Sequence, residues 1–383
     1  MNMNAKIIVA LVLACLLVGS AYAYAGSFFF APADAPSAAL EERIAKSIES
    51  TKLSLTVMVH DSEGNLKAYQ HDPDDPINRN FVNLMNIFLY NAKQSQLPAL
   101  YADDGQSYTP HLHVPVSGGT GYSYWFNSHD FFIGIGTGSG TATASTYQLF
   151  EKYGDYYQPS SVVYVNGSII ITCSIPISGT ATITNVGGFM RGGSYYSSVD
   201  YGIWYANDFM MFHDNINAIN VVAGDVVTVV YNLTLAPQFT DNFRAFVKMA
   251  LTPAPLVGTG HVTFTDTSGS SFTALMVCGR DVNNFMFDSD IVPSIPNLLF
   301  VGNGTAPVSR TSYALSSPVG SGYPINYARN DTYIVAGASG VATANLTLTE
   351  MGVVSYVCDD GPNTAKPVLM WRDVFDQTVV DAG

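Results

Sequence analysis

Charged residues are scarce in this chain of 383 residues. Asp, Glu, Lys and Arg make up 12% of it, about half of the roughly 25% found in average soluble proteins. Thirty acidic and 16 basic residues give a net charge of −14, and the absence of a basic stripe argues against nucleic-acid binding through phosphates. The polar surface must therefore consist largely of Ser, Thr, Asn and Gly, which is typical of extracellular or assembled β-proteins.

Catalytic signatures are also missing. The sequence contains no G-x-S-x-G nucleophile elbow and no H-E-x-x-H zinc motif, which are short patterns that mark common hydrolases. The glycine-rich run at 134–140 is not followed by the helix that a dinucleotide-binding loop requires, so we interpret it as a structural turn. Nothing in the sequence predicts an enzyme.

Long apolar runs are confined to the N-terminus. Lys6 precedes an apolar run at 7–19, and two A-x-A triplets follow within 21–25. This pattern predicts a secretory signal peptide over residues 1–25. An uncleaved membrane anchor is the alternative, because residues 7–25 approach the roughly 20 residues that span a bilayer. In both cases we expect the rest of the chain to be extracellular or at the cell surface.

Cysteine is rare too. Beyond Cys15 in the apolar run, the chain contains Cys173, Cys278 and Cys358, so at least one of the three stays unpaired. Cys278 and Cys358 could form a disulfide, and three buried thiols are the alternative. In a secreted protein the N-x-S/T sequons could carry glycans. These sequons lie at Asn166, Asn232, Asn303, Asn330 and Asn345.

Short β-patterned segments are what the sequence has in abundance. Hydrophobic residues make up 48% of the chain and aromatic residues 12%, which is ample for a buried core. Alternating runs bounded by turn residues recur about every ten residues, as in antiparallel β-sandwiches. Examples are residues 53–60, 161–165, 168–175 and 181–186. Helical spacing of apolar residues occurs at 38–50 and 81–91, and we expect a matching helical segment after Asn242–Phe243.

Two halves of the chain match each other about 160 residues apart, in conserved order. The matches are Asn80–Phe81 with Asn242–Phe243, Gly136–Gly138 with Gly302–Gly304, 146–149 with 312–315, 182–187 with 347–352, 211–214 with 370–373, and Ala223–Gly224 with Ala382–Gly383. We therefore predict two tandem antiparallel β-sandwich domains of immunoglobulin or jelly-roll type, each with a short helix. They cover 51–237 (the first repeat) and 238–383 (the second repeat), after an N-terminal apolar helix and an extension at 26–50.

The second repeat has no match for one strand. In the first repeat, Ala223–Gly224 leads into the alternating strand 225–235, whereas Ala382–Gly383 is followed by no such segment. We expect an open apolar groove there, which a strand from another copy could fill by β-strand addition. The candidate assembly residues are Phe28, Phe29 and Phe30 in the donor segment 26–31, and Val379, Val380 and Gly383 beside the groove. A reading frame that continues beyond Gly383 is the alternative.

These anchors resemble a known class of modules. The G-x-G turn, the S/T-Y-x-L segment, the T-E/N-x-G segment, the (K/R/H)-D strand and the A-G-D-V-x-V-x-Y strand are similar to a β-sandwich module in structural proteins of tailed phages and archaeal viruses. Asn185 and His213 depart from the pattern, which prefers Glu and Arg. The missing strand resembles donor-strand-complemented archaeal surface filaments. The resemblance implies a self-assembling structural protein whose partners are other copies of itself, in a filament, virion or surface layer.

Aromatic clusters give an alternative function. Two segments, 122–126 and 195–209, are rich in Tyr and Trp between Gly and Ser, and we interpret them as loops. Such side chains suit an interface or stacking on sugar rings, and capping of the core is the competing interpretation. The residues concerned are Tyr124, Trp125, Tyr195, Tyr196, Trp204 and Tyr205. On this hypothesis the protein is a monomeric adhesin or carbohydrate-binding protein that recognises host surface glycans.

An acidic loop is the metal site that we favour from the sequence. Asp72, Asp74 and Asp75 supply several carboxylates within four positions, and calcium prefers six to eight oxygen ligands. Solvated turn residues are the alternative. No other cofactor is predicted.

Overall fold

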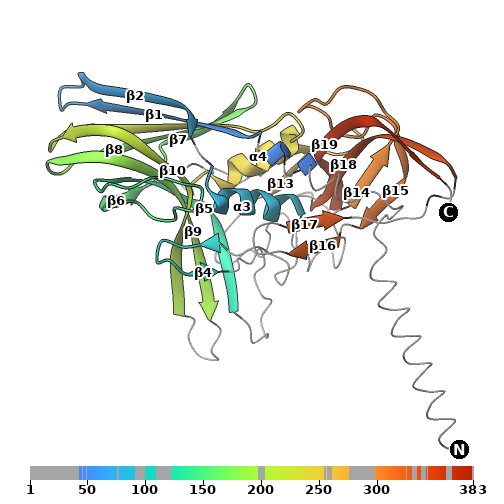
Figure 1. Ribbon diagram of the computed structural model, residues 1–383, viewed down its shortest axis with the longest axis horizontal. Helices are drawn as coiled ribbons and strands as arrows, with labels where there is room; N and C mark the ends of the chain where they lie inside the picture. The colour runs from blue at the N-terminus through green and yellow to red at the C-terminus, as the bar shows by residue number, and fades with distance from the viewer. Residues whose placement is uncertain are drawn as a thin grey trace, which may run out of the picture.

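The computed structural model describes residues 43–44, 46–48, 50–75, 77–90, 100–108, 122–196, 203–253, 256, 261–275, 298–324, 326–329, 334–337, 342, 344–358 and 365–381. The chain is mainly β, with antiparallel sheets and few helices, which confirms the predicted fold class at that level (Figure 1). The predicted N-terminal apolar helix lies outside the described residues.

The first repeat contains a five-stranded sheet in the order β2-β1-β11-β8-β7. Its strands form where apolar and polar residues alternate, because successive side chains point to opposite faces of a strand. On β11 the buried residues are Val227, Val229, Tyr231 and Leu233. The strands are β1 (Lys52–His60), β2 (Leu66–Asp75), β7 (Ser161–Val165), β8 (Ser168–Pro176) and β11 (Val226–Thr234).

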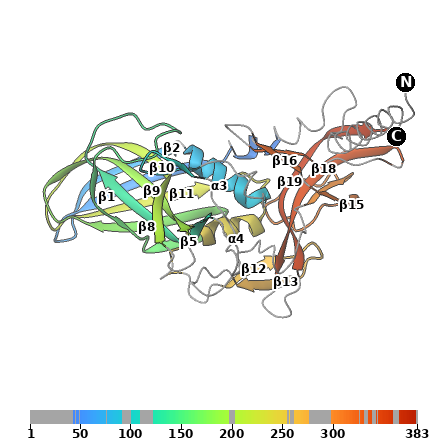
Figure 2. The same ribbon diagram turned by 90° about the horizontal axis from the view of Figure 1, so that it is seen from below.

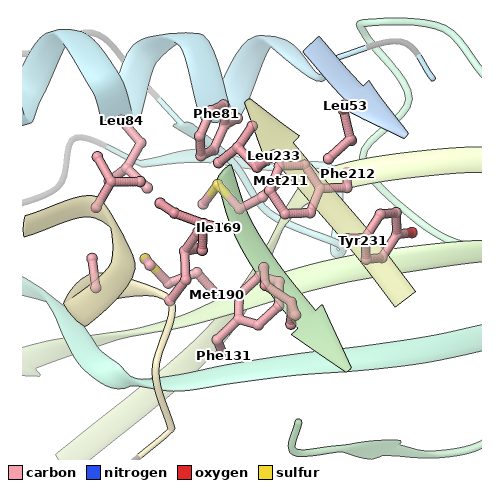
Figure 3. Close-up of a cluster of buried hydrophobic side chains, with 14 of the residues drawn as sticks. Leu53, Phe81, Leu84, Phe131, Ile169, Met190, Met211, Phe212, Tyr231 and Leu233 are labelled. Atoms are coloured by element: carbon pink, nitrogen blue, oxygen red, sulfur yellow. The ribbon is translucent and has the colours of Figure 1, made fainter. Parts of the chain in front are cut away.

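A four-stranded sheet in the order β10-β9-β5-β6 accompanies it. Side chains of the two sheets meet in one buried cluster, which Figure 3 shows in close-up. The ring of Phe212 on β10 lies 5.2 Å from Tyr231 on β11 and 5.9 Å from Phe131 on β5, measured between centroids. The strands are β5 (Tyr122–Gly136), β6 (Lys152–Tyr157), β9 (Ala181–Tyr196) and β10 (Ile203–Val221).

The second repeat contains a four-stranded sheet in the order β15-β14-β18-β19. This order repeats β6-β5-β9-β10 strand for strand. Its members are β14 (Leu298–Gly302), β15 (Pro318–Pro324), β18 (Leu346–Cys358) and β19 (Ala365–Val380). Two-stranded pairings complete the described strands: β3 (Leu100–Tyr101) with β4 (Ser107–Tyr108), β12 (His261–Thr265) with β13 (Ser271–Leu275), and β16 (Asn326–Arg329) with β17 (Ile334–Gly337).

Two helices, α3 (Arg79–Tyr90) and α4 (Asp241–Ala250), lie between the sheets of the two repeats (Figures 1 and 2). Each helix is fixed in place by an asparagine at the equivalent position. The side-chain amide of Asn80 donates to the carbonyls of Tyr101 and Met210, and that of Asn242 donates to those of Thr265 and Leu369. The equivalence of the two repeats therefore extends to individual hydrogen bonds.

The junction between the repeats is held by a buried arginine. Arg244 on α4 is 2% exposed, and its guanidinium donates to four carbonyl oxygens. Those carbonyls belong to Gly167, Leu235, Ala236 and Phe239. Because three of them lie in the connection that follows β11, this one side chain fixes the path between the repeats.

Replacing Arg244 with methionine is expected to lower the free energy of unfolding by about 2–3 kcal/mol, because buried carbonyls lose charge-assisted hydrogen bonds. Chemical denaturation measures the change. The matched control is Arg310→Met, which removes an ion pair to Asp241 whose two side chains are 40% and 39% exposed. A pair of that kind contributes about 0–1 kcal/mol. Equal losses in the two variants would contradict the structural role of Arg244.

Candidate functional site

In the second repeat, a buried carboxylate braces the G-x-G turn. Glu350 on β18 accepts hydrogen bonds from the backbone N–H groups of Gly304, Ser316 and Ser317, and from Arg372 on β19 at 2.7 Å. Burial alone would raise the pKa of Glu350, but the N–H groups and the guanidinium outweigh it and hold the pKa below its ordinary value. The carboxylate is therefore ionised and fully paired.

The first repeat has a neutral version of the same brace. Asn185 on β9 accepts from the N–H of Phe150 at 3.1 Å, and its Oδ1 lies 3.4 Å from His213 Nε2. Burial lowers the pKa of His213 to about 4. A Cβ at Gly136 would lie 2.5 Å from the Asn185 side chain, and one at Gly302 would lie 2.7 Å from Glu350. The close approach explains the glycine at both positions.

β11 occupies a central sheet position in the first repeat. It pairs antiparallel with β1 on one side and with β8 on the other, each along its whole length. Four of its side chains, Val227, Val229, Tyr231 and Leu233, are fully buried. The strand is therefore a main contributor to this layer of the core.

The corresponding position in the second repeat is not filled by any described residue. The β16–β17 pair follows β15 as the β7–β8 pair follows β6, and both pairs are antiparallel. β8 has β7 on one side and β11 on the other, whereas β17 has only β16 as a partner among the described strands. The edge of β17 that has no partner among the described strands is the candidate assembly site, and we call it the vacant edge.

The N-terminal extension contacts the second repeat. The helical residues 43–44 and 46–48 lie against β19, where Arg43 forms an ion pair of 2.7 Å with Asp373 and lies over the Phe375 ring at 5.0 Å from its centroid. The indole N–H of Trp371 donates to the hydroxyl of Ser47. The extension is therefore anchored on the sheet β15-β14-β18-β19 of the second repeat.

A buried acidic cluster lies in the first repeat. Asp75 ends β2, Asp214 lies on β10, and burial raises the pKa of Asp75 to about 9, with Asp214 and Asp72 adding to the shift. Burial likewise raises the pKa of Asp214 to about 6. The hydroxyl of Tyr231 on β11 is buried beside them. The sequence did not mark Asp214 or Tyr231 as site residues. The match between Asp214 and Asp373 was the one signal that could have pointed to Asp214.

The structure describes only two of the predicted assembly residues. Phe28, Phe29, Phe30 and Gly383 lie outside the described residues. Val379 and Val380 lie at the end of β19, paired with Thr347 and Leu346, and Val379 is 61% exposed. Their role in assembly stays a prediction.

The interpretation of the aromatic segments as loops is wrong. Tyr124 and Trp125 lie on β5, Tyr195 and Tyr196 on β9, and Trp204 and Tyr205 on β10. The neighbouring glycines caused the error, because they occur within β9: Gly193 pairs with Trp125 in the ladder. A glycine opposite a bulky aromatic residue is compatible with a strand. The side chains of these aromatic residues lie outside the described part of the structure.

The predicted calcium loop is not assembled as one ligand set. The N–H of Asp74 donates to the carboxylate of Asp72 in a local turn, while Asp75 is buried on the strand. Over the described ranges, no three or more His, Cys, Asp or Glu side chains are grouped for metal binding.

The remaining site residues are dispersed. Cys173 is a buried free thiol whose pKa is raised by burial to about 12. Cys278 and the side chain of Cys358 lie outside the described residues, so their disulfide stays a prediction. Among the sequons, Asn166, Asn303 and Asn345 are exposed, Asn232 is half-buried on β11, and Asn330 is outside the described residues.

No protein-family model, curated protein or solved structure matches this chain. Within the described parts of the chain, no helix is long and apolar enough to cross a membrane.

Proposed function

We propose that this protein is a secreted or surface-exposed structural protein that self-assembles by β-strand complementation. Each copy inserts a strand into the vacant β17 edge of the next copy. The observation that carries the proposal is that β8 has two neighbours in its sheet, whereas its counterpart β17 has one among the described strands. An edge of this kind, filled by a strand from the next copy, suits a polar head-to-tail assembly.

The proposal includes a two-layer reading of each repeat as a β-sandwich. In the first repeat, the sheets β2-β1-β11-β8-β7 and β10-β9-β5-β6 share one core. In the second repeat, one layer is β15-β14-β18-β19. Among the described strands, the β16–β17 pair alone is left to form the opposite layer. A strand added beside β17 would supply main-chain hydrogen bonds and apolar side chains to this thinner layer.

The buried side chains of β11 indicate how much free energy a donated strand could contribute. Its four fully buried side chains each contribute about 1.5–3 kcal/mol by burial. Ordering a donated strand costs about 1–2 kcal/mol per residue in backbone entropy, so main-chain hydrogen bonds and side-chain packing must act together. An exposed strand edge is in any case prone to pair with another chain.

The proposed donor is the segment 26–31 of a neighbouring copy, with Phe28 and Phe30 facing the core. The anchoring of Arg43 on Asp373 supports this choice, because it roots the segment beside the second repeat. The residues between Ala31 and Arg43 could extend to roughly 40 Å, at about 3.3–3.6 Å per residue. That reach is enough to cross to an adjacent copy in a filament, virion or surface layer.

Deleting residues 26–36 is expected to abolish polymers. The experiment compares residues 26–383 with residues 37–383 by electron microscopy and sedimentation. A Phe28→Ser/Phe30→Ser variant of residues 26–383 separates the loss of apolar side chains from the loss of chain. Equal polymerisation of all three chains would contradict the proposal. A second outcome would also contradict it: residues 26–383 are monomeric, and deletion of 26–36 lowers their stability. Segment 26–31 would then fill the β17 edge of its own copy.

A further inference from the structure

Three side chains from three strands converge at an edge of the first repeat, where β2 comes close to β10. Asp75, Asp214 and Tyr231 are 4%, 6% and 0% exposed. Both carboxylate oxygens of Asp75, one oxygen of Asp214 and the hydroxyl of Tyr231 are buried without any hydrogen-bond partner. Tyr231 therefore donates to neither carboxylate, although both lie near enough to act on it electrostatically.

An arrangement of this kind is costly without a ligand. Buried polar groups are nearly always hydrogen-bonded, and buried charges are nearly always paired or bound to metal. No described Lys or Arg forms an ion pair with Asp75 or Asp214. The half-buried Asp72 lies near enough to raise the pKa of both carboxyls. The raised pKa values show that protons neutralise these carboxyls when no ligand is present. A single cation between the three strands would displace those protons and give every unpartnered oxygen a partner.

The second repeat shows how that need is met at the equivalent position. Asp373 on β19 matches Asp214 on β10, and it is paired with the Arg43 guanidinium at 2.7 Å. The first repeat places another acid, Asp75, next to Asp214. Arg43 supplies the cation at the second site, whereas no described side chain supplies one at the first.

We propose that Asp75, Asp214 and Tyr231 bind a hard divalent cation of the calcium class. The protein donors are all oxygens, which favours calcium or magnesium over softer metals. Backbone carbonyls or water would complete the six to eight ligands that calcium takes. The site differs from the acidic loop predicted from sequence, since it shares only Asp75 with that loop. It is also independent of the proposed assembly.

Binding at this point would clamp the two sheets of the first repeat together. β2 is an edge strand of the five-stranded sheet, and β10 is an edge strand of the four-stranded sheet. The described link between these edges is one hydrogen bond, from the N–H of Asn217 to the side chain of Gln70 at 2.9 Å. A cation would add ligand bonds to β2, β10 and β11 together.

Calcium titration of the metal-depleted full chain tests the proposal. We expect one calcium ion per chain by isothermal calorimetry, and a rise in Tm of roughly 5 °C or more at 100 times Kd. Asp75→Asn should abolish both the binding and the Tm rise. Tyr231→Phe should weaken binding without unfolding the chain, because the lost hydroxyl has no partner.

The matched control is Asp74→Asn, which removes an exposed carboxylate one residue away and should respond to calcium as the wild type does. A wild-type Tm that is the same in EDTA and in millimolar calcium would overturn the proposal. A calcium response that persists in Asp75→Asn would overturn it too. If Asp75→Asn is simply more stable than the metal-free wild type and neither binds calcium, the cluster holds protons or water instead.

Discussion

Replacing Arg372 with methionine is expected to lower the free energy of unfolding by about 3–5 kcal/mol, as is usual when a buried ion pair loses one partner. Glu350 is fully buried, and the substitution would leave its charge without a counterion. The same substitution would also remove donors to the carbonyls of Ala306 and Pro307. Urea denaturation followed by circular dichroism measures the effect.

The double variant Arg372→Met/Glu350→Gln separates the two causes. It should recover part of the loss, because no buried charge is left unpaired.

The dependence of the free energy of unfolding on pH gives a second check of the Glu350–Arg372 pair. The lowered pKa of Glu350 means that its stabilisation is complete above the ordinary carboxyl pKa and is lost as the pH falls through the lowered value. A loss below about 1 kcal/mol in Arg372→Met, a size typical of exposed pairs, would show that the brace is dispensable.

Appending a copy of residues 225–235 directly after Gly383 is expected to raise the Tm by roughly 5 °C or more. In the first repeat, Ala223–Gly224 turns the chain into β11, and Ala382–Gly383 offers the same dipeptide at the matching place. The appended strand could then pair with β17 as β11 pairs with β8. The gain should come from its buried apolar side chains, at about 1.5–3 kcal/mol each before entropy is counted.

A control tail of the same length isolates the packing. It has serine at the four positions that correspond to Val227, Val229, Tyr231 and Leu233. This tail keeps the backbone but supplies no apolar side chains, so the Tm should not rise. An equal effect of both tails would mean that β17 does not accept the strand in the expected register.

The repeat was predictable from sequence because its signals are local. Gly136 and Gly302 are required by close contact with Asn185 and Glu350, and the strand registers place each glycine opposite that same residue. Constraints of this kind leave short motifs at fixed spacing. Alternation of apolar residues was likewise sufficient to predict β1, β8 and β11.

Features made by long-range contacts were not predictable. Arg244 contacts Gly167 across 77 positions, and nothing near Arg244 in the sequence indicates that it is buried. Asp75 and Asp214 come together only because β2 and β10 are edge strands of neighbouring sheets. Local pattern also misplaced the aromatic segments, since the glycines on β9 indicate a loop unless their partners on β5 are known.

Sedimentation velocity of the chain with and without the appended strand tests the central claim most directly. If assembly depends on the vacant edge of β17, residues 26–383 should form polymers and the chain with the apolar tail should sediment as a monomer, while the serine tail leaves polymers intact. Polymers of undiminished size in the chain with the apolar tail would contradict strand complementation at this edge.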